Sequence, residues 1–237
     1  MPEADASIIL DDTCWELMTS EEPFFSFIIS YSAHVADNAD DVLAVYAIKQ
    51  HPEYDDPNRD DELDYLYAKA RLTDDMFTVL LKRLAKDDLL ENTVIIAYDD
   101  HYNYGVSDKD LVQQLSEANG SSILERTPAF IWYDGCESME VDKVCQTIDW
   151  VPTIANLFGV DVTPYVMGND IFDDAYAGYA IFPDGTWLTE TTYAVNGIPR
   201  WNNGMTGAEI EQMNSLVETF YNANEAILAS DYYSQFD

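Results

Sequence analysis

The 237-residue chain combines a large apolar fraction with a strongly negative charge. Hydrophobic residues make up 47% of the sequence and aromatic residues 13%, which is enough for a sizeable core and argues against a disordered chain. There are 45 acidic and 11 basic residues, and the net charge of −34 argues against nucleic acids and anionic lipid surfaces as partners. The charge suits a secreted or cell-surface protein, a salt-rich habitat or a surface that attracts cations. Most of the carboxylates are expected to be merely solvated.

The sequence predicts neither a membrane span nor a zinc site. No apolar run approaches the roughly 18 residues of a transmembrane helix, and no basic segment followed by an apolar one marks a signal peptide. The three cysteines, Cys14, Cys136 and Cys145, show no CxxC spacing. Cys136 and Cys145 are placed to pair across a hairpin, with buried thiols as the alternative.

The first 62 residues predict a helix, a buried strand and a long loop. The pattern over 6–19 is helical, and Pro23 ends it. The sequence FFSFIISY at 24–31 is an almost unbroken apolar run of strand length, which is typical of a buried strand in an α/β sheet. Residues 33–62 are polar and acidic and contain two prolines, so they are expected to form a long surface loop.

A long amphipathic helix is the clearest element that the sequence predicts. Apolar residues recur at three- and four-residue spacing over about seven turns, at Leu63, Leu66, Tyr67, Ala70, Phe77, Leu80, Leu81 and Leu84. The sequence TVIIAY at 93–98 then predicts a second buried strand. Together with the strand at 24–31, this order predicts a right-handed parallel crossover of strand, helix and strand.

The remainder of the chain predicts further helices and a small sheet. The expected elements are a short helix at 108–118, a strand at 127–133, a helix at 147–159 and a small antiparallel sheet at 176–203. Thr206 and Glu209 form a capping-box pattern that opens a terminal helix.

Asp100 and His101 follow directly after the strand predicted at 93–98. In open α/β sheets, ligands bind beyond the carboxyl ends of the strands, so chemistry is expected here. A carboxylate beside an imidazole offers oxygen and nitrogen donors that suit Mn²⁺, Zn²⁺ or Mg²⁺. The plainer interpretation, in which the two residues cap a turn, stays open from the spacing alone.

His34 lies just beyond the strand predicted at 24–31. If the two strands share one sheet, their carboxyl ends lie on the same edge, and His34 and His101 can face one site. A histidine there can bind a phosphate or sulfate oxygen or act as an acid. A surface-loop histidine is the alternative for His34, and His51 is expected to be exposed.

Several motifs occur in an order that covers nearly the whole chain. They are EPFFSFIISYSAH (22–34), LLENTVIIAYDDHYNYG (89–105), RTPAFIWY (126–133), QTIDWVPTIANLFGVD (146–161), MGNDIFD (167–173), YAVNG (193–197) and ASDYY (229–233). Each motif alone is weak, but their order and spacing are specific. The sequence resembles the extracellular catalytic domain of lipoteichoic acid synthases and their sulfatase-like relatives, within the alkaline phosphatase superfamily.

The resemblance implies a sulfatase-like α/β fold with a mixed, mostly parallel sheet and flanking helices. A small C-terminal antiparallel sheet and a terminal helix would complete it. Residues 1–237 would form the C-terminal part of one catalytic domain. The main sheet would lie within about 1–175, and the small sheet and terminal helix within about 176–237.

The resemblance also implies roles for three residues. Asp100 and His101 would be ligands of a single divalent metal, usually manganese in this family, with magnesium, zinc and calcium as alternatives. His34 would contact the phosphate of a glycerolphosphate-type substrate. The family normally has glycine where this sequence has Asp99, so an extra charge lies beside the expected metal.

The family's Thr nucleophile and Glu ligand are expected upstream of this chain. Residues 1–22 are too short to contain them, and Thr13 lies in a helical pattern. We therefore expect no catalytic nucleophile in this chain, an incomplete metal site, and no activity without the N-terminal half of the domain as a partner.

The expected function is that of a phosphoglycerol transferase acting on phosphodiester head groups of a lipid. By resemblance, its place would be the extracellular face of a bacterial membrane, or the protein would be secreted. One alternative is a sulfatase or phosphodiesterase that hydrolyses a sulfate or phosphate ester. Another is a non-catalytic surface binding or assembly module.

Overall fold

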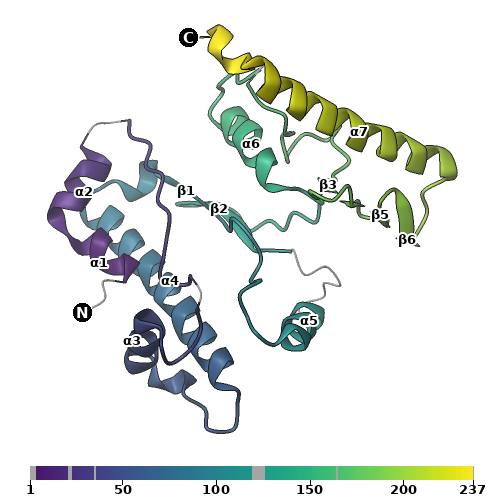
Figure 1. Ribbon diagram of the computed structural model, residues 1–237. Coiled ribbons are helices and arrows are strands. Elements are labelled where there is room, and N and C mark those ends of the chain that lie inside the picture. Colours follow the sequence, from purple (N-terminus) through teal and green to yellow (C-terminus); the bar gives the residue numbers. More distant parts are fainter. Residues whose placement is uncertain (1–3, 21–22, 35, 119–125, 164, 237) are drawn as a thin grey trace. The chain divides into compact units, whose positions relative to one another are not determined.

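The computed structural model describes residues 4–20, 23–34, 36–118, 126–163 and 165–236 (Figure 1). Contacts between Cα atoms divide the chain into two compact units. We call residues 1–137 the N-terminal unit and residues 138–237 the C-terminal unit. None of the described helices is both long enough and apolar enough to cross a membrane.

The N-terminal unit is mostly helical. Its helices and strands are α1 (Asp5–Leu10), α2 (Asp12–Thr19), α3 (Val42–Gln50), α4 (Asp61–Lys86), β1 (Val94–Tyr98), α5 (Lys109–Ala118) and β2 (Ala129–Tyr133). Short 3₁₀ turns at Pro52–Tyr54 and Leu90–Asn92 precede α4 and β1. The long helix, the short helix at 108–118 and the strands at 93–98 and 127–133 are thereby confirmed within one or two residues. The strand at 93–98 is partly exposed, however, and not buried as predicted.

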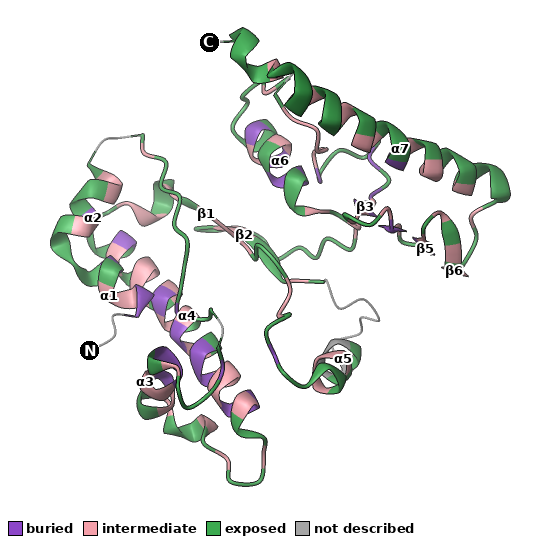
Figure 2. Ribbon diagram, viewed as in Figure 1, coloured by how far each residue is buried: buried purple, intermediate pink, exposed green. Residues whose placement is uncertain are grey.

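Helix α4 is the central element of this unit. Asp60 caps it by accepting a hydrogen bond from the backbone N–H of Glu62. Its buried residues pack in two apolar clusters with Ala4 and with residues of the preceding helices. The first cluster contains Ala4, Ala47, Ala68 and Leu72, and the second contains Ile9, Trp15, Met76 and Leu84. Figure 2 shows these buried positions along one side of α4. The amphipathic pattern of the sequence therefore predicts the packing side correctly.

The buried strand predicted at 24–31 is wrong. The backbone there is extended, but it belongs to neither of the two sheets of the described residues. Side chains along it are exposed, including Phe25 at 84%, Phe27 at 68% and Ile29 at 79% (Figure 2). A strand forms only where a neighbour pairs with its backbone N–H and C=O groups, and the described residues place none beside this run. The predicted parallel crossover is accordingly absent from them.

Two further local predictions need correction. The predicted loop over 33–62 contains α3, because Asp41 caps a helix there by accepting from the N–H groups of Leu43 and Ala44. The predicted helix over 6–19 is two helices separated at Asp11, whose side chain accepts from the N–H of Cys14 and starts α2.

Strand β1 pairs with β2 in an antiparallel two-stranded sheet, with Val94 opposite Tyr133 and Tyr98 opposite Ala129. The sheet packs on α4, since the rings of Phe77 and Phe130 meet edge to face at 5.4 Å between centroids. Ile95 adds to the cluster that contains Met76. The two-stranded sheet that precedes the candidate metal ligands therefore packs against α4.

The C-terminal unit combines a small sheet with a long helix. Its elements are a 3₁₀ turn (Thr147–Asp149), α6 (Trp150–Leu157), β3 (Ala180–Ile181), β4 (Trp187–Leu188), β5 (Thr192–Val195), β6 (Ile198–Asn202), α7 (Gly207–Ser230) and a final 3₁₀ turn (Tyr232–Phe236). The strands pair antiparallel in the order β3-β4-β5-β6. Trp187, Ala194 and Val217 form the core between sheet and α7. The helix at 147–159, the small sheet and the terminal helix are thus confirmed, and Cys136 and Cys145 are not joined in a disulfide.

The capping box at the start of α7 is confirmed and gives a direct test. The N–H of Glu209 donates to the hydroxyl of Thr206, and the N–H of Thr206 donates to the carboxylate of Glu209. We expect Thr206→Ala to lower the free energy of unfolding by about 1 kcal/mol, since one helix-end N–H loses its acceptor. Urea unfolding checks this, with Thr219→Ala in the exposed middle of α7 as the matched control. An equal loss in both variants would contradict the cap assignment.

Candidate metal and phosphate site

Asp100 and His101 lie beyond the end of β1 with their side chains facing one another. Oδ1 of Asp100 is 3.5 Å from Nε2 of His101, and the two side chains are 85% and 42% exposed. Nδ1 of His101 lies 2.9 Å from the carbonyl oxygen of Tyr102. A carbonyl oxygen only accepts, so Nδ1 is the donor in this hydrogen bond. Oδ1 of Asp100 and Nε2 of His101 therefore face each other on an open surface.

This pair fits a divalent cation. Two ligands about 2.1 Å from one ion in a tetrahedral arrangement lie about 3.4 Å apart, close to the observed distance. A histidine that binds a metal usually donates its other ring N–H to a carboxylate or a backbone carbonyl, as His101 does to Tyr102. In the described part of the chain, however, no group of three or more His, Cys, Asp and Glu side chains is placed to hold a metal. The pair therefore offers two donor atoms of a candidate metal site.

Asp99 adds a second carboxyl group next to this pair. Partial burial raises its pKa above 3.8, the negative charge of Asp100 raises it further, and His101 lowers it. The carboxyl group of Asp99 is therefore harder to ionise than that of an ordinary exposed aspartate.

His34 lies in a turn after the extended segment 24–31. Its N–H donates to the carbonyl oxygen of Tyr31 at 3.0 Å, and its ring stacks on the Tyr31 ring with centroids 4.9 Å apart. The carboxylate of Asp5 accepts from the N–H groups of Tyr31 and Ser32, and the N–H of Asp5 donates to the hydroxyl of Ser32. Asp5 and Ser32 are buried, so the turn that carries His34 is fixed to the start of α1.

Helix α4 holds the segment that follows His34 and the segment that follows His101. Nζ of Lys69 donates to the carbonyl oxygens of His34 and Ala36. Two turns earlier, the carboxylate of Glu62 accepts from the N–H of Ser107 at 2.7 Å, six residues after His101. The expectation that His34 and His101 face one site stays a prediction, and this common attachment to α4 supports it.

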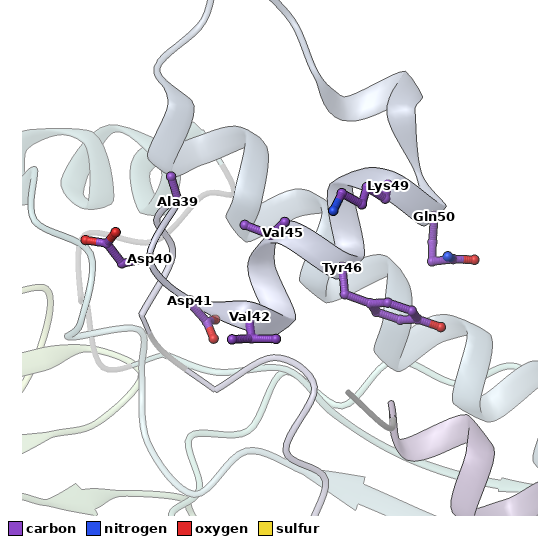
Figure 3. Close-up of a pocket in the computed structure, with 8 residues that line it drawn as sticks. All are labelled: Ala39, Asp40, Asp41, Val42, Val45, Tyr46, Lys49 and Gln50. Carbon is purple, nitrogen blue, oxygen red and sulfur yellow. The ribbon is translucent and has the colours of Figure 1, made fainter. Parts of the chain in front are cut away.

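Two surface hollows lie near these attachments. The first, of about 370 Å³, is lined by residues 39–42 and by Val45, Tyr46, Lys49 and Gln50, with residues 39 and 40 at one end and residues 49 and 50 at the other (Figure 3). The second, of about 330 Å³, has an acidic wall made by Asp37, Asp60, Asp61 and Glu62. Neither hollow is lined by His34, Asp100 or His101.

The sequence analysis missed two features of this region. Lys69 and Asp37 are buried, although both residue types are normally exposed. A signal for Lys69 was present, because it lies three and seven residues before Leu72 and Met76 in the apolar stripe of α4. His51 is not exposed as predicted: its side chain is 13% exposed, and Nε2 lies 2.8 Å from Asp75.

Comparison with known proteins identifies the family. A sequence model described as sulfatase matches residues 3–160, more than half of the chain. Lipoteichoic acid synthase 2 from Bacillus subtilis (strain 168) is 27% identical over 165 residues, which are 65% of this chain and 24% of that protein. Lipoteichoic acid synthase from Staphylococcus aureus (strain USA300) is 27% identical over 185 residues, 75% of this chain and 27% of that protein.

A solved structure gives the same answer for the fold. The crystal structure of the lipoteichoic acid synthase LtaP from Listeria monocytogenes matches with a TM-score of 0.73 and 19% identity, covering 95% of this chain and 59% of that chain. The predicted sulfatase-like α/β fold is confirmed. The chain spans about a quarter of the length of the two synthases above. The match over residues 3–160 and the similarity to these synthases show that the chain belongs to the sulfatase family, in the alkaline phosphatase superfamily.

Proposed function

We propose that this chain supplies part of the metal site and the phosphate contact of a phosphoglycerol transferase of the lipoteichoic acid synthase type. The observation that carries the proposal is the facing pair of Asp100 Oδ1 and His101 Nε2, 3.5 Å apart beyond β1. The similarity to lipoteichoic acid synthases supports a lipid with a phosphoglycerol head group as the substrate class.

Each candidate residue has one role in this proposal. Asp100 and His101 hold a divalent metal, most often manganese in such enzymes, and their oxygen and nitrogen donors also suit magnesium or zinc. A bound ion of this kind supplies charge stabilisation for the phosphodiester oxygens. His34 contacts the phosphate, because a neutral or protonated imidazole can donate a hydrogen bond to its oxygens.

The remaining catalytic groups come from an upstream part of the domain. That part carries the Thr nucleophile and a Glu ligand, and it acts as the partner of this chain at the extracellular face of a bacterial membrane or in a secreted enzyme. The exposed run with Phe25, Phe27 and Ile29 supports this, since apolar side chains in extended backbone are suited to pair with further strands.

The test joins this chain to an upstream part that carries the Thr nucleophile and measures release of diacylglycerol from phosphatidylglycerol with Mn²⁺. We expect turnover from the joined protein, none from the chain alone, and a loss of about 100-fold or more in Asp100→Ala and in His101→Ala, because each removes a metal ligand. His51→Gln is the matched control, since His51 contacts Asp75 and Glu53 instead.

The products and controls decide between the outcomes. Transfer of phosphoglycerol to an added glycerol acceptor supports a transferase, whereas release of free glycerol phosphate alone indicates a phosphodiesterase. Turnover by residues 1–237 alone, or full activity in the Asp100→Ala variant, would refute the proposal.

A further inference from the structure

Lys69 is a fully buried cation in the middle of α4, with a side chain that is 0% exposed. Nζ donates to the carbonyl oxygen of His34, to that of Ala36 at 3.1 Å, and to the carboxylate of Asp41 at 3.0 Å. An ammonium group removed from water costs several kcal/mol unless paired groups replace its hydration. In this chain the buried ammonium group contacts the backbone carbonyl oxygen of His34.

Two carboxylates neutralise this cation. Oδ1 of Asp37, in a side chain that is 1% exposed, lies 3.3 Å from Nζ of Lys69. Asp41 also caps α3, so its carboxylate joins that helix to Lys69. The cation thus connects α4, the start of α3 and the segment that follows His34. We call Lys69, Asp37 and Asp41 the buried triad.

We propose that Lys69 is a positioning residue that sets the place of the His34 imidazole. It holds the two carbonyl groups on the downstream side of the turn, and Asp5 holds the N–H groups of Tyr31 and Ser32 on the upstream side. The inference rests on the proposed function only for the task of His34, which is to contact a substrate phosphate.

Helix α4 makes a second attachment, through Glu62, that serves as an internal control for Lys69. Glu62 binds the N–H of Ser107 in the segment after His101, and it precedes Lys69 by seven residues, a rise of about 10 Å along α4. Lys69 therefore fixes the His34 segment, and Glu62 fixes the segment with Asp100 and His101. Removing one attachment should disturb one histidine and leave the other in place.

The test uses the NMR signals of the imidazole rings in the 237-residue chain at one alkaline pH, where imidazole protonation does not contribute to the shift. The chain has three histidines, so His34→Gln, His51→Gln and His101→Gln assign every signal. Stacking on Tyr31 gives the His34 ring protons a ring-current shift. The variants are Lys69→Met, Lys69→Met with Asp37→Asn, Glu62→Ala, and Lys82→Met as an exposed control on α4.

We expect both Lys69 variants to lose the His34 ring-current shift while the His51 and His101 signals stay in place. Glu62→Ala should move only the His101 signals, and Lys82→Met should move none. The double variant removes the buried charge that Lys69→Met leaves unpaired, so it separates positioning from stability. An unmoved His34 signal in a folded Lys69 variant, a common shift of all three rings, or failure of both Lys69 variants to fold would overturn the positioning role. The lipid assay tests the proposed function separately, so each claim can fail alone.

Discussion

Replacing Gly168 with alanine is expected to destabilise the C-terminal unit by about 3 kcal/mol. A Cβ atom there would lie 2.1 Å from the carbonyl oxygen and 2.6 Å from the carbonyl carbon of Ile148. These are backbone atoms that cannot turn aside as a flexible side chain can. One of the two segments must therefore move.

The movement would break buried hydrogen bonds to the side chain of Asp149, which lies next to this contact. Asp149 is fully buried, and its carboxylate accepts from the N–H of Asn169 at 2.8 Å and from the hydroxyl of Tyr176 at 3.1 Å. Burial raises the pKa of Tyr176, and the neighbouring Asp149 adds to the rise, so the hydroxyl stays a donor. Shifting residues 168 and 169 would leave buried acceptors unpaired, which adds to the loss.

Urea unfolding followed by tryptophan fluorescence measures this effect. Gly207→Ala is the matched control, because a Cβ at the start of α7 meets nothing within 4 Å. Alanine there is expected to be neutral or to stabilise by up to about 1 kcal/mol. A Gly168→Ala variant as stable as Gly207→Ala would show that the close contact with Ile148 is not a constraint.

Lys69→Met is expected to lower the free energy of unfolding by about 3–5 kcal/mol at neutral pH. The methionine fills a similar volume but leaves Asp37 and Asp41 without their cation, and neither carboxylate oxygen of Asp37 has a hydrogen-bond partner among the described residues. Lys82→Met changes the same residue type at an exposed position of the same helix and should cost less than about 0.5 kcal/mol.

The loss in Lys69→Met should shrink as the pH falls. Burial raises the pKa of Asp37 above 3.8, and Lys69 opposes that rise, so the pKa increases further without Lys69. The folded variant then holds a proton on Asp37 at pH values where the unfolded chain has lost it. The contribution of Asp37 to the stability of this variant is therefore greatest below 3.8 and declines as the pH rises through the raised pKa. Urea unfolding at about pH 7 and about pH 5 checks the sign, and a larger loss at the lower pH would contradict it.

Elements with a local cause were predictable from the sequence. The apolar spacing along α4 and the pair Thr206 and Glu209 carry their own helix signals, and both predictions are confirmed. Helix α3 had a local signal as well, in Asp41 followed by Leu43, Ala44 and Ala47 on one side. The acidic composition around it concealed that signal.

Features that depend on distant partners were not predictable. The run at 24–31 has strand composition, but a strand also needs neighbours, and these lie outside its own sequence. The buried triad likewise depends on Lys69 meeting residues more than 25 positions away, at His34, Ala36 and Asp41. The pair Asp100 and His101 is adjacent in the chain, so its proximity followed from the sequence, whereas its geometry required the structure.

Calorimetric titration of the 237-residue chain with Mn²⁺ tests the central claim most directly. The proposed half-site predicts micromolar binding that disappears in a variant carrying both Asp100→Ala and His101→Ala, because these side chains offer the facing donors. The His51→Gln variant should bind as the unaltered chain does. Binding of equal strength in the doubly substituted variant, or no binding in any of the three proteins, would contradict a preformed metal half-site at Asp100 and His101.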